Sequence, residues 1–278
     1  MIRIITDSLS DLTMAYAKEH DFDIMPLLVR FGQEEYKCGV DLSNEAFYEK
    51  LETSEEPPAT AAVNPYEFED IFKRYVEAGD DIVAIIFSKH MSATFQSASI
   101  AAEGIRSDKI HLIDCENGAM GQALLVETAV RLRDAGKNAD EIETEIRNLI
   151  PKTKTYFVVD NMNYLHRSGR ISETAAEVNE TVSIHPVLYL KADGVNPVDK
   201  VRGRKSALTW LANVLKERPA DENYTLVIGH SNALERAETL KSMVEDAGIK
   251  NNILITCIGP IVGTHIGPNS MGIGYIEA

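Results

Sequence analysis

The chain has 278 residues, of which 44% are hydrophobic, so its length and apolar content favour two domains over one. Its 43 acidic and 28 basic side chains leave a net charge of −15, which argues against nucleic acid and anionic membrane surfaces as partners. The three cysteines are far apart, form no CxxC pair and have no histidine at metal-ligand spacing, which argues against a disulfide framework and a metal site.

In the first half of the chain, short apolar runs alternate with amphipathic stretches, which predicts strands that alternate with helices. The expected strands are residues 2–6, 24–31, 82–87 and 110–113. The expected helices are residues 44–51, 66–77, 94–103 and 118–132. This alternation indicates crossover units on a parallel sheet.

A charged helix over 139–150 ends at Pro151, and a new apolar run follows. We therefore place a domain boundary here, with residues 1–152 in an N-terminal domain and 153–278 in a C-terminal domain. The second half predicts strands at 156–159, 187–190, 224–229, 252–258 and 272–276, a short strand after an Asp193-Gly194 turn, and helices at 205–216 and 233–247. Strands joined by an Asp-Gly turn favour a mixed or antiparallel second sheet.

Four loop segments combine hydroxyl, glycine or histidine residues near the ends of expected strands. They are Thr6-Asp7-Ser8, Pro58-Ala59-Thr60, Ser92-Ala93-Thr94 and Gly263-Thr264-His265. Ligands of open α/β sheets bind beyond the carboxyl ends of the strands, so the three segments in the first domain predict one shared rim. Ser92 also fits the role of a helix cap. The two roles are compatible, because a helix N-terminus beside a hydroxyl is an anion site.

Two segments resemble catalytic templates only in part. The glycine-rich segment 259–275 lacks the lysine of a phosphate loop and runs into the last strand, so we interpret it as a tight turn. Residues 229–233 follow a strand and precede a helix, like a nucleophile elbow, but only His265 follows as a partner for Ser231. A serine hydrolase or a small-molecule phosphotransferase that uses Ser231 and His265 stays open as an alternative.

Four basic residues lie within six positions at the start of an expected helix, in an otherwise acidic chain. They are Lys200, Arg202, Arg204 and Lys205. Cations at a helix N-terminus oppose the helix dipole, so this placement suggests that the charges serve an anion or an acidic partner. Exposed solubilising charge is the alternative.

Seven motifs follow one another along almost the whole chain. In chain order they are IITDSLSDL, PAT, FSKHMSATFQSA, YLHRSGRIS, HPVLYLKADG, KVRGRKSAL and IGPIVGTHIGP. In this order they resemble the signatures of the DegV family of bacterial fatty-acid-binding proteins. The resemblance implies an α/β fold with a doubly wound, mostly parallel N-terminal domain and a C-terminal α/β domain with a mixed or antiparallel sheet. One long-chain fatty acid, such as palmitate, would lie between the two domains.

The resemblance also implies roles for individual residues. Thr60 and Ser92 would donate hydrogen bonds to the fatty-acid carboxylate, with help from backbone N–H groups at Ala93 and Thr94. His265 would lie close to the headgroup. In related proteins of this kind the carrier needs no cofactor and is not itself an enzyme.

A partner is implied as well. In such relatives a separate ATP-dependent fatty acid kinase phosphorylates the presented carboxylate. Arg202 would help the bound lipid engage that kinase, and Arg170 and His265 belong to the same partner or headgroup side. A regulatory or scaffold protein with lipid as a structural filler stays open as a further alternative.

The sequence departs from the family pattern at several positions. Ala61 and Ala62 follow Thr60 where Ser is usual, Ala93 replaces Gly, Ser168 stands where Gly is frequent, and Ile266 stands where Thr is common. We expect carboxylate binding through Thr60 and Ser92 to survive these changes.

The N-terminus is unlike a signal peptide and no run of about 18 apolar residues exists, so we expect a soluble cytoplasmic protein without integral membrane association.

Overall fold

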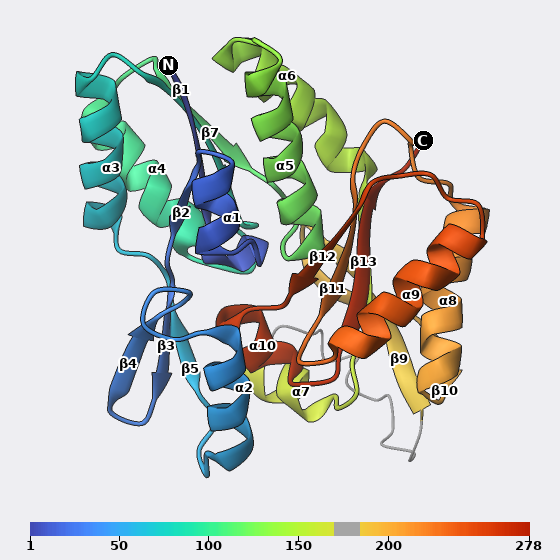
Figure 1. Cartoon of the computed structure of the whole chain (residues 1–278). Helices are drawn as coiled ribbons and strands as arrows, with labels where there is room; N and C mark the ends of the chain where they lie inside the picture. Colours follow the sequence, from blue (N-terminus) through green and yellow to red (C-terminus); the bar gives the residue numbers. More distant parts are fainter. Residues whose placement is uncertain (170–183) are drawn as a thin grey trace.

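The computed structural model describes residues 1–169 and 184–278 (Figure 1). The first half forms a four-stranded parallel sheet in the order β2-β1-β6-β7. Its strands are β1 (Ile2–Asp7), β2 (Asp23–Met25), β6 (Asp81–Ile86) and β7 (Ile110–Asp114). From Ile82 onward β6 is buried at every residue, which is typical of a parallel strand covered on both faces.

Helices cover both faces of this parallel sheet, so the first half is doubly wound as predicted. On one face, α3 (Pro65–Glu77) and α4 (Thr94–Ile105) pack against alternate residues of β6. On the other face lie α1 (Met14–Glu19), α5 (Met120–Asp134) and α6 (Ala139–Leu149). Helices α3 and α6 both begin with a capping box, formed by Asn64 with Glu67 and by Asn138 with Glu141.

A small antiparallel sheet, which the sequence did not predict, adjoins this domain. It contains β3 (Leu28–Phe31), β4 (Glu34–Lys37) and β5 (Ala59–Ala61), and α2 (Asn44–Thr53) lies between β4 and β5 in the chain. The single strand expected over 24–31 is therefore wrong, because β2 and β3 belong to different sheets. Pro26 explains the break: it has no N–H group to continue the ladder, and the next N–H, of Leu27, donates to the Ser8 hydroxyl.

The second half forms a six-stranded sheet in the order β10-β9-β8-β13-β11-β12. Its strands are β8 (Thr153–Val158), β9 (Ile184–Lys191), β10 (Gly194–Arg202), β11 (Leu226–His230), β12 (Ile253–Cys257) and β13 (Met271–Ile276). Only β11 and β12 pair in parallel, so the expected mixed sheet is confirmed. The expected hairpin is confirmed too, with β10 returning against β9 from Gly194 at φ +125°.

Helix α5 packs against both large sheets and joins the two halves (Figure 1). On the opposite face of the six-stranded sheet lie α8 (Arg204–Glu217) and α9 (Leu234–Asp246). The strand β8 begins at Thr153, beside the expected domain boundary, which stays a prediction. Among the described residues, none of the helices is long and apolar enough to cross a membrane.

Two short helices lie near the junction, α7 (Asn163–Ser168) and α10 (Pro260–Ile266). Helix α10 corrects our interpretation of the glycine-rich segment as a tight turn. Pro260 occupies its first turn, where its missing N–H costs nothing. A Cβ on Gly263 would lie 2.8 Å from both Phe47 Cε1 and the Tyr48 hydroxyl, so this glycine allows α10 to approach α2 closely.

Candidate binding site

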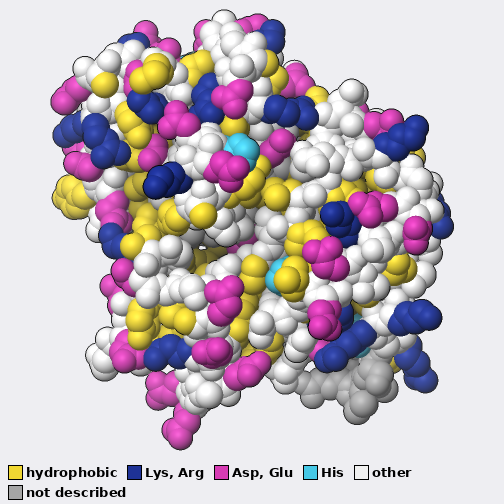
Figure 2. Space-filling model, viewed as in Figure 1, with side chains coloured by type: hydrophobic (Ala, Val, Ile, Leu, Met, Phe, Trp, Pro, Cys, Tyr) yellow, Lys and Arg dark blue, Asp and Glu magenta, His cyan; other side chains and the backbone are white. Residues whose placement is uncertain are grey.

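A cavity of about 260 Å³ lies at the junction of the two halves. Figure 2 shows hydrophobic side chains gathered around a hollow near the middle of one face. The cavity walls come from the small sheet, the loops after β1 and β6, the start of α5, strands β8 to β10, and helices α7 and α10. The lining residues include Leu9, Leu27, Phe87, Met91, Met120, Phe157, Leu165, Leu190, Val195, Ile258, Ile261 and Ile266. Most of the wall is therefore aliphatic or aromatic.

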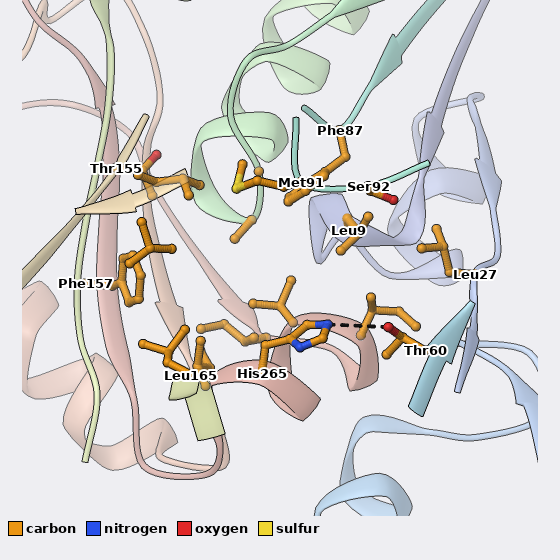
Figure 3. Close-up of a pocket in the computed structure, with 18 of the residues that line it drawn as sticks. Leu9, Leu27, Thr60, Phe87, Met91, Ser92, Thr155, Phe157, Leu165 and His265 are labelled. Atoms are coloured by element: carbon orange, nitrogen blue, oxygen red, sulfur yellow. Dashed lines mark hydrogen bonds between the residues drawn. The ribbon is translucent and has the colours of Figure 1, made fainter. Parts of the chain in front are cut away.

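Polar side chains gather at one end of this cavity. Thr60 on β5 and His265 on α10 both line it, and Thr60 Oγ1 lies 3.4 Å from His265 Nε2 (Figure 3). Ser92, in the loop before α4, lines the cavity on the same side as Thr60 and Leu27 (Figure 3). Three segments that are far apart in the chain thus bring two hydroxyls and an imidazole to one end.

The N-terminus of α4 reinforces this polar end. Its N-cap residue is Ala93, which lines the cavity and makes no side-chain capping bond. Ser92 Oγ accepts the Thr94 N–H at 3.2 Å and lies 3.0 Å from Thr94 Oγ1, while Thr94 itself is buried and is not a lining residue. Because a helix N-terminus carries partial positive charge, this end favours an anion without a Lys or Arg.

The opposite end of the cavity, at Thr155 and Phe157, offers little to an anion (Figure 3). The Thr155 hydroxyl donates to Asn117 Oδ1 at 2.8 Å. Helix α5 also begins here, and the N–H groups of its second and third residues, Gly121 and Gln122, both donate to the Gly118 carbonyl. The cavity is therefore polar at one end and apolar at the other.

A second, more polar pocket of about 340 Å³ adjoins the polar end. Thr60 and His265 line both pockets, so they lie between the apolar cavity and this outer pocket. Its wall includes Tyr164 and Arg167 of α7, and the Arg167 guanidinium lies 5.0 Å from the centre of the Tyr164 ring. Our sequence reasoning did not select Arg167, although it lies within the YLHRSGRIS motif.

Helix α10 is held in place by hydrogen bonds from the first half. The Tyr48 hydroxyl donates to the Ile258 carbonyl at 2.8 Å, and Asn44 Nδ2 donates to the Cys257 carbonyl at 3.2 Å. The Gly259 N–H donates to Asp11 Oδ1 at 2.8 Å. Burial raises the pKa of Asp11 to about 8. These contacts fix the position from which His265 faces Thr60.

The remaining residues selected from the sequence lie outside the cavity. Arg202 is exposed at the end of β10, pairs in register with Ile184, and belongs to no ion pair among residues 1–169 and 184–278. Arg170 lies outside the described residues. Ser231 is fully buried, and its Oγ accepts the Ser270 N–H at 2.7 Å. Ser231 therefore has no access to the cavity that His265 lines.

One group of side chains in the described part of the chain has its ligand atoms close enough to share a metal ion. It consists of His111, Asp140 and Glu143, and the sequence spacing gave no signal for it. His111 Nδ1 lies 2.6 Å from Glu143 Oε2, and Arg147 lies 2.7 Å from the other Glu143 oxygen. These contacts tie α6 to β7, and the group does not line the cavity.

Comparisons with known proteins agree with the fold. A family model described as "Uncharacterised protein, DegV family" matches residues 1–278. A DegV domain-containing protein of Clostridium perfringens is 34% identical over 281 residues, which cover 98% of this chain and 96% of the relative. A fatty acid binding DegV family protein of Streptococcus agalactiae has a TM-score of 0.89 at 27% identity, covering 100% of this chain and 99% of the other. A stearic-acid-binding protein of Eubacterium ventriosum has a TM-score of 0.88 at 26% identity, covering 100% and 98%. The chain thus belongs to the DegV family.

Proposed function

We propose that this protein binds one long-chain fatty acid in the cavity, with the carboxylate at Thr60 and Ser92 and the acyl chain directed toward Phe157. The observation that carries the proposal is the polarity of the cavity: hydroxyls and a helix N-terminus border one end, and the rest is apolar. The solved relatives whose names state fatty-acid or stearic-acid binding support the same ligand class.

Burial of the acyl chain supplies most of the affinity. About 15 methylenes at about 0.8 kcal/mol each give about 12 kcal/mol of gross stabilisation, from which several kcal/mol of lost freedom must be subtracted. Tight binding therefore needs few polar contacts. This energy also favours straight-chain lipids over small polar metabolites, which would leave the apolar wall unfilled.

The carboxylate requires donors, because an unpaired charge in an apolar cavity costs several kcal/mol. Thr60, Ser92 and the N-terminus of α4 meet that requirement with neutral groups. Neither Lys nor Arg is found among the described residues that line the cavity. A headgroup held without a salt bridge is easier to release, which suits a carrier that hands the acid to another protein.

We further propose that the protein is a cytoplasmic carrier and not an enzyme, and that it presents the carboxylate to an ATP-dependent fatty acid kinase. Thr60 and His265 border both the cavity and the outer pocket. A carboxylate bound beside these two residues therefore faces the outer pocket and the surface. Burial of Ser231 argues against the hydrolase alternative. We assign Arg202 to the surface that the kinase contacts.

Native mass spectrometry of the purified protein tests the ligand. We expect a mass increment of one fatty acid, and we expect Thr60→Val combined with Ser92→Ala to lose most of it. The matched control is Thr53→Val with Ser99→Ala, which makes the same chemical changes outside the cavity. Full lipid occupancy in the Thr60/Ser92 variant would overturn the headgroup assignment.

The partner and the filler alternative need separate tests. Arg202→Ala should retain bound fatty acid but slow its ATP-dependent phosphorylation by the kinase. Lys216→Ala, which removes an exposed cation from the last turn of α8, should behave like the wild type. Equal loss of lipid and turnover in Arg202→Ala would place Arg202 at the ligand instead.

A bound lipid that never exchanges with added isotope-labelled palmitate would favour the structural-filler alternative over a carrier.

A further inference from the structure

Met120, the first residue of α5, fills a space that three glycines leave open in the six-stranded sheet. A Cβ on Gly229 of β11 would lie 2.3 Å from Met120 Sδ, and one on Gly272 of β13 would lie 2.3 Å from Met120 Cε. A Cβ on Gly274 would lie 2.6 Å from Met120 Cβ. The methionine side chain therefore lies directly against the sheet backbone, in a glycine trough formed by Gly229, Gly272 and Gly274.

Met120 also belongs to the apolar end of the cavity. It is a lining residue and is 2% exposed. A Cβ on Gly272 would also lie 3.0 Å from Phe157 Cβ, so Met120 and Phe157 both lie close to this glycine. Phe157 lies across the cavity from Thr60 (Figure 3). The next residue, Gly121, packs against the Thr155 hydroxyl at the same end. The Met120 side chain thus separates the cavity from the glycine trough.

We propose that Met120 determines the length of acyl chain that the protein accepts, because the methyl end of the fatty acid stops against its thioether. This inference rests on the proposed function. Without the Met120 side chain the cavity and the glycine trough join, because the three glycines present no side chains of their own. Methionine is unbranched and flexible, so it closes such an irregular space without strain.

Met120→Ala tests the proposal, since it removes Cγ, Sδ and Cε and leaves room for about two methylenes. Each additional buried methylene raises affinity about fourfold, so the preference should move about 15-fold toward chains about two carbons longer. The delipidated full chain is incubated with an equimolar mixture of even-numbered saturated fatty acids from laurate to behenate. The bound acids are then extracted and quantified by mass spectrometry.

Two further variants separate a length stop from general loosening of the cavity. Met120→Ala with Gly229→Ala returns a methyl group to the vacated space; once Met120 is shortened, the nearest remaining neighbour of that methyl is Ile258 Cγ1 at 3.4 Å. We expect this double variant to regain the preference for shorter chains. Met162→Ala is the matched control, because it makes the same change in the same hydrophobic cluster at a buried residue that does not line the cavity, so it should not change the length preference.

Should Met120→Ala not fold, Met120→Val shortens the side chain by about two atoms, keeps an apolar group, and should produce a smaller shift in the same direction. A length distribution in the Met120 variants equal to that of the wild type would overturn the proposal, as would an equal shift in Met162→Ala. A wild-type protein that takes up no acid from the mixture would instead overturn the proposed function itself.

Discussion

Thr60→Val isolates one hydroxyl of the headgroup site, because valine keeps the shape of threonine and removes its hydrogen bond. In this structure the Thr60 hydroxyl meets His265 Nε2 at 3.4 Å, which is near the upper limit for a hydrogen bond, so redirecting it to a carboxylate costs little. A hydrogen bond to a charged group contributes about 1.5–3 kcal/mol. The predicted loss of affinity is therefore about tenfold to a hundredfold.

Displacement of a fluorescent fatty acid from the delipidated protein measures this change as a ratio of Kd values. Thr60→Ser keeps the hydroxyl and should stay within a few-fold of the wild type, and Thr53→Val on α2 controls for the substitution itself. Valine and serine variants that lose affinity equally would show that the fit of the whole Thr60 side chain, and not its hydroxyl alone, sets the affinity. A Thr60→Val variant with unchanged Kd would refute the carboxylate assignment.

Three further predictions concern stability. Burial raises the pKa of Asp11 to about 8, so the folded state keeps a proton that the unfolded chain releases near pH 4, and stability falls as the pH rises between these values. Asp11→Asn should flatten that dependence in urea unfolding at pH 5 and pH 8, and an unchanged slope would contradict the assignment. Hydrogen bonds from the N-terminal ammonium at 2.7 Å and from Arg3 at 2.9 Å lower the pKa of Asp80, so Asp80→Asn should lower the Tm at pH 7. That difference should shrink at acid pH, where Asp80 is protonated in both states; a constant difference in thermal melts would argue against it. Gly118→Ala should cost about 1–3 kcal/mol in urea unfolding, because its Cβ would lie 1.9 Å from Phe87 Cε2. Gly104→Ala on α4 is the control, because a Cβ at Gly104 would have no atom within 4 Å. Equal stability of the two variants would disprove the clash.

Much of the secondary structure follows from local pattern. The strands expected at 2–6, 82–87 and 110–113 correspond to β1, β6 and β7, and the Asp193-Gly194 turn does join an antiparallel hairpin. These predictions were confirmed because apolar periodicity and turn chemistry act over a few residues. Local pattern does not predict which strands pair with one another. Residues 24–31 have the pattern of one strand, although their two parts, β2 and β3, join different sheets.

The site was predicted only in part. Thr60, Ser92 and His265 belong to segments that the sequence pattern selected, and the resemblance to the DegV family implied their roles. The structure brings them to one end of a cavity. Their roles toward a carboxylate remain predictions. Met120 and Arg167 were missed, because a methionine in an apolar helix and an arginine in a polar motif look like ordinary core and surface residues.

The sequence alone thus determined the longer helices, most strands, the α/β class and the family, since each depends on neighbouring residues or on ordered motifs. It did not predict the short helices α1, α7 and α10. Only the tertiary structure decided that a cavity exists, where its polar end lies, and that α10 is a helix packed on α2 through Gly263. The physical reason is that a cavity is what remains after distant elements pack together. Whether Met120 lies against bare backbone depends on Gly229 and Gly272, more than 100 positions away in the chain, and no local pattern records that contact.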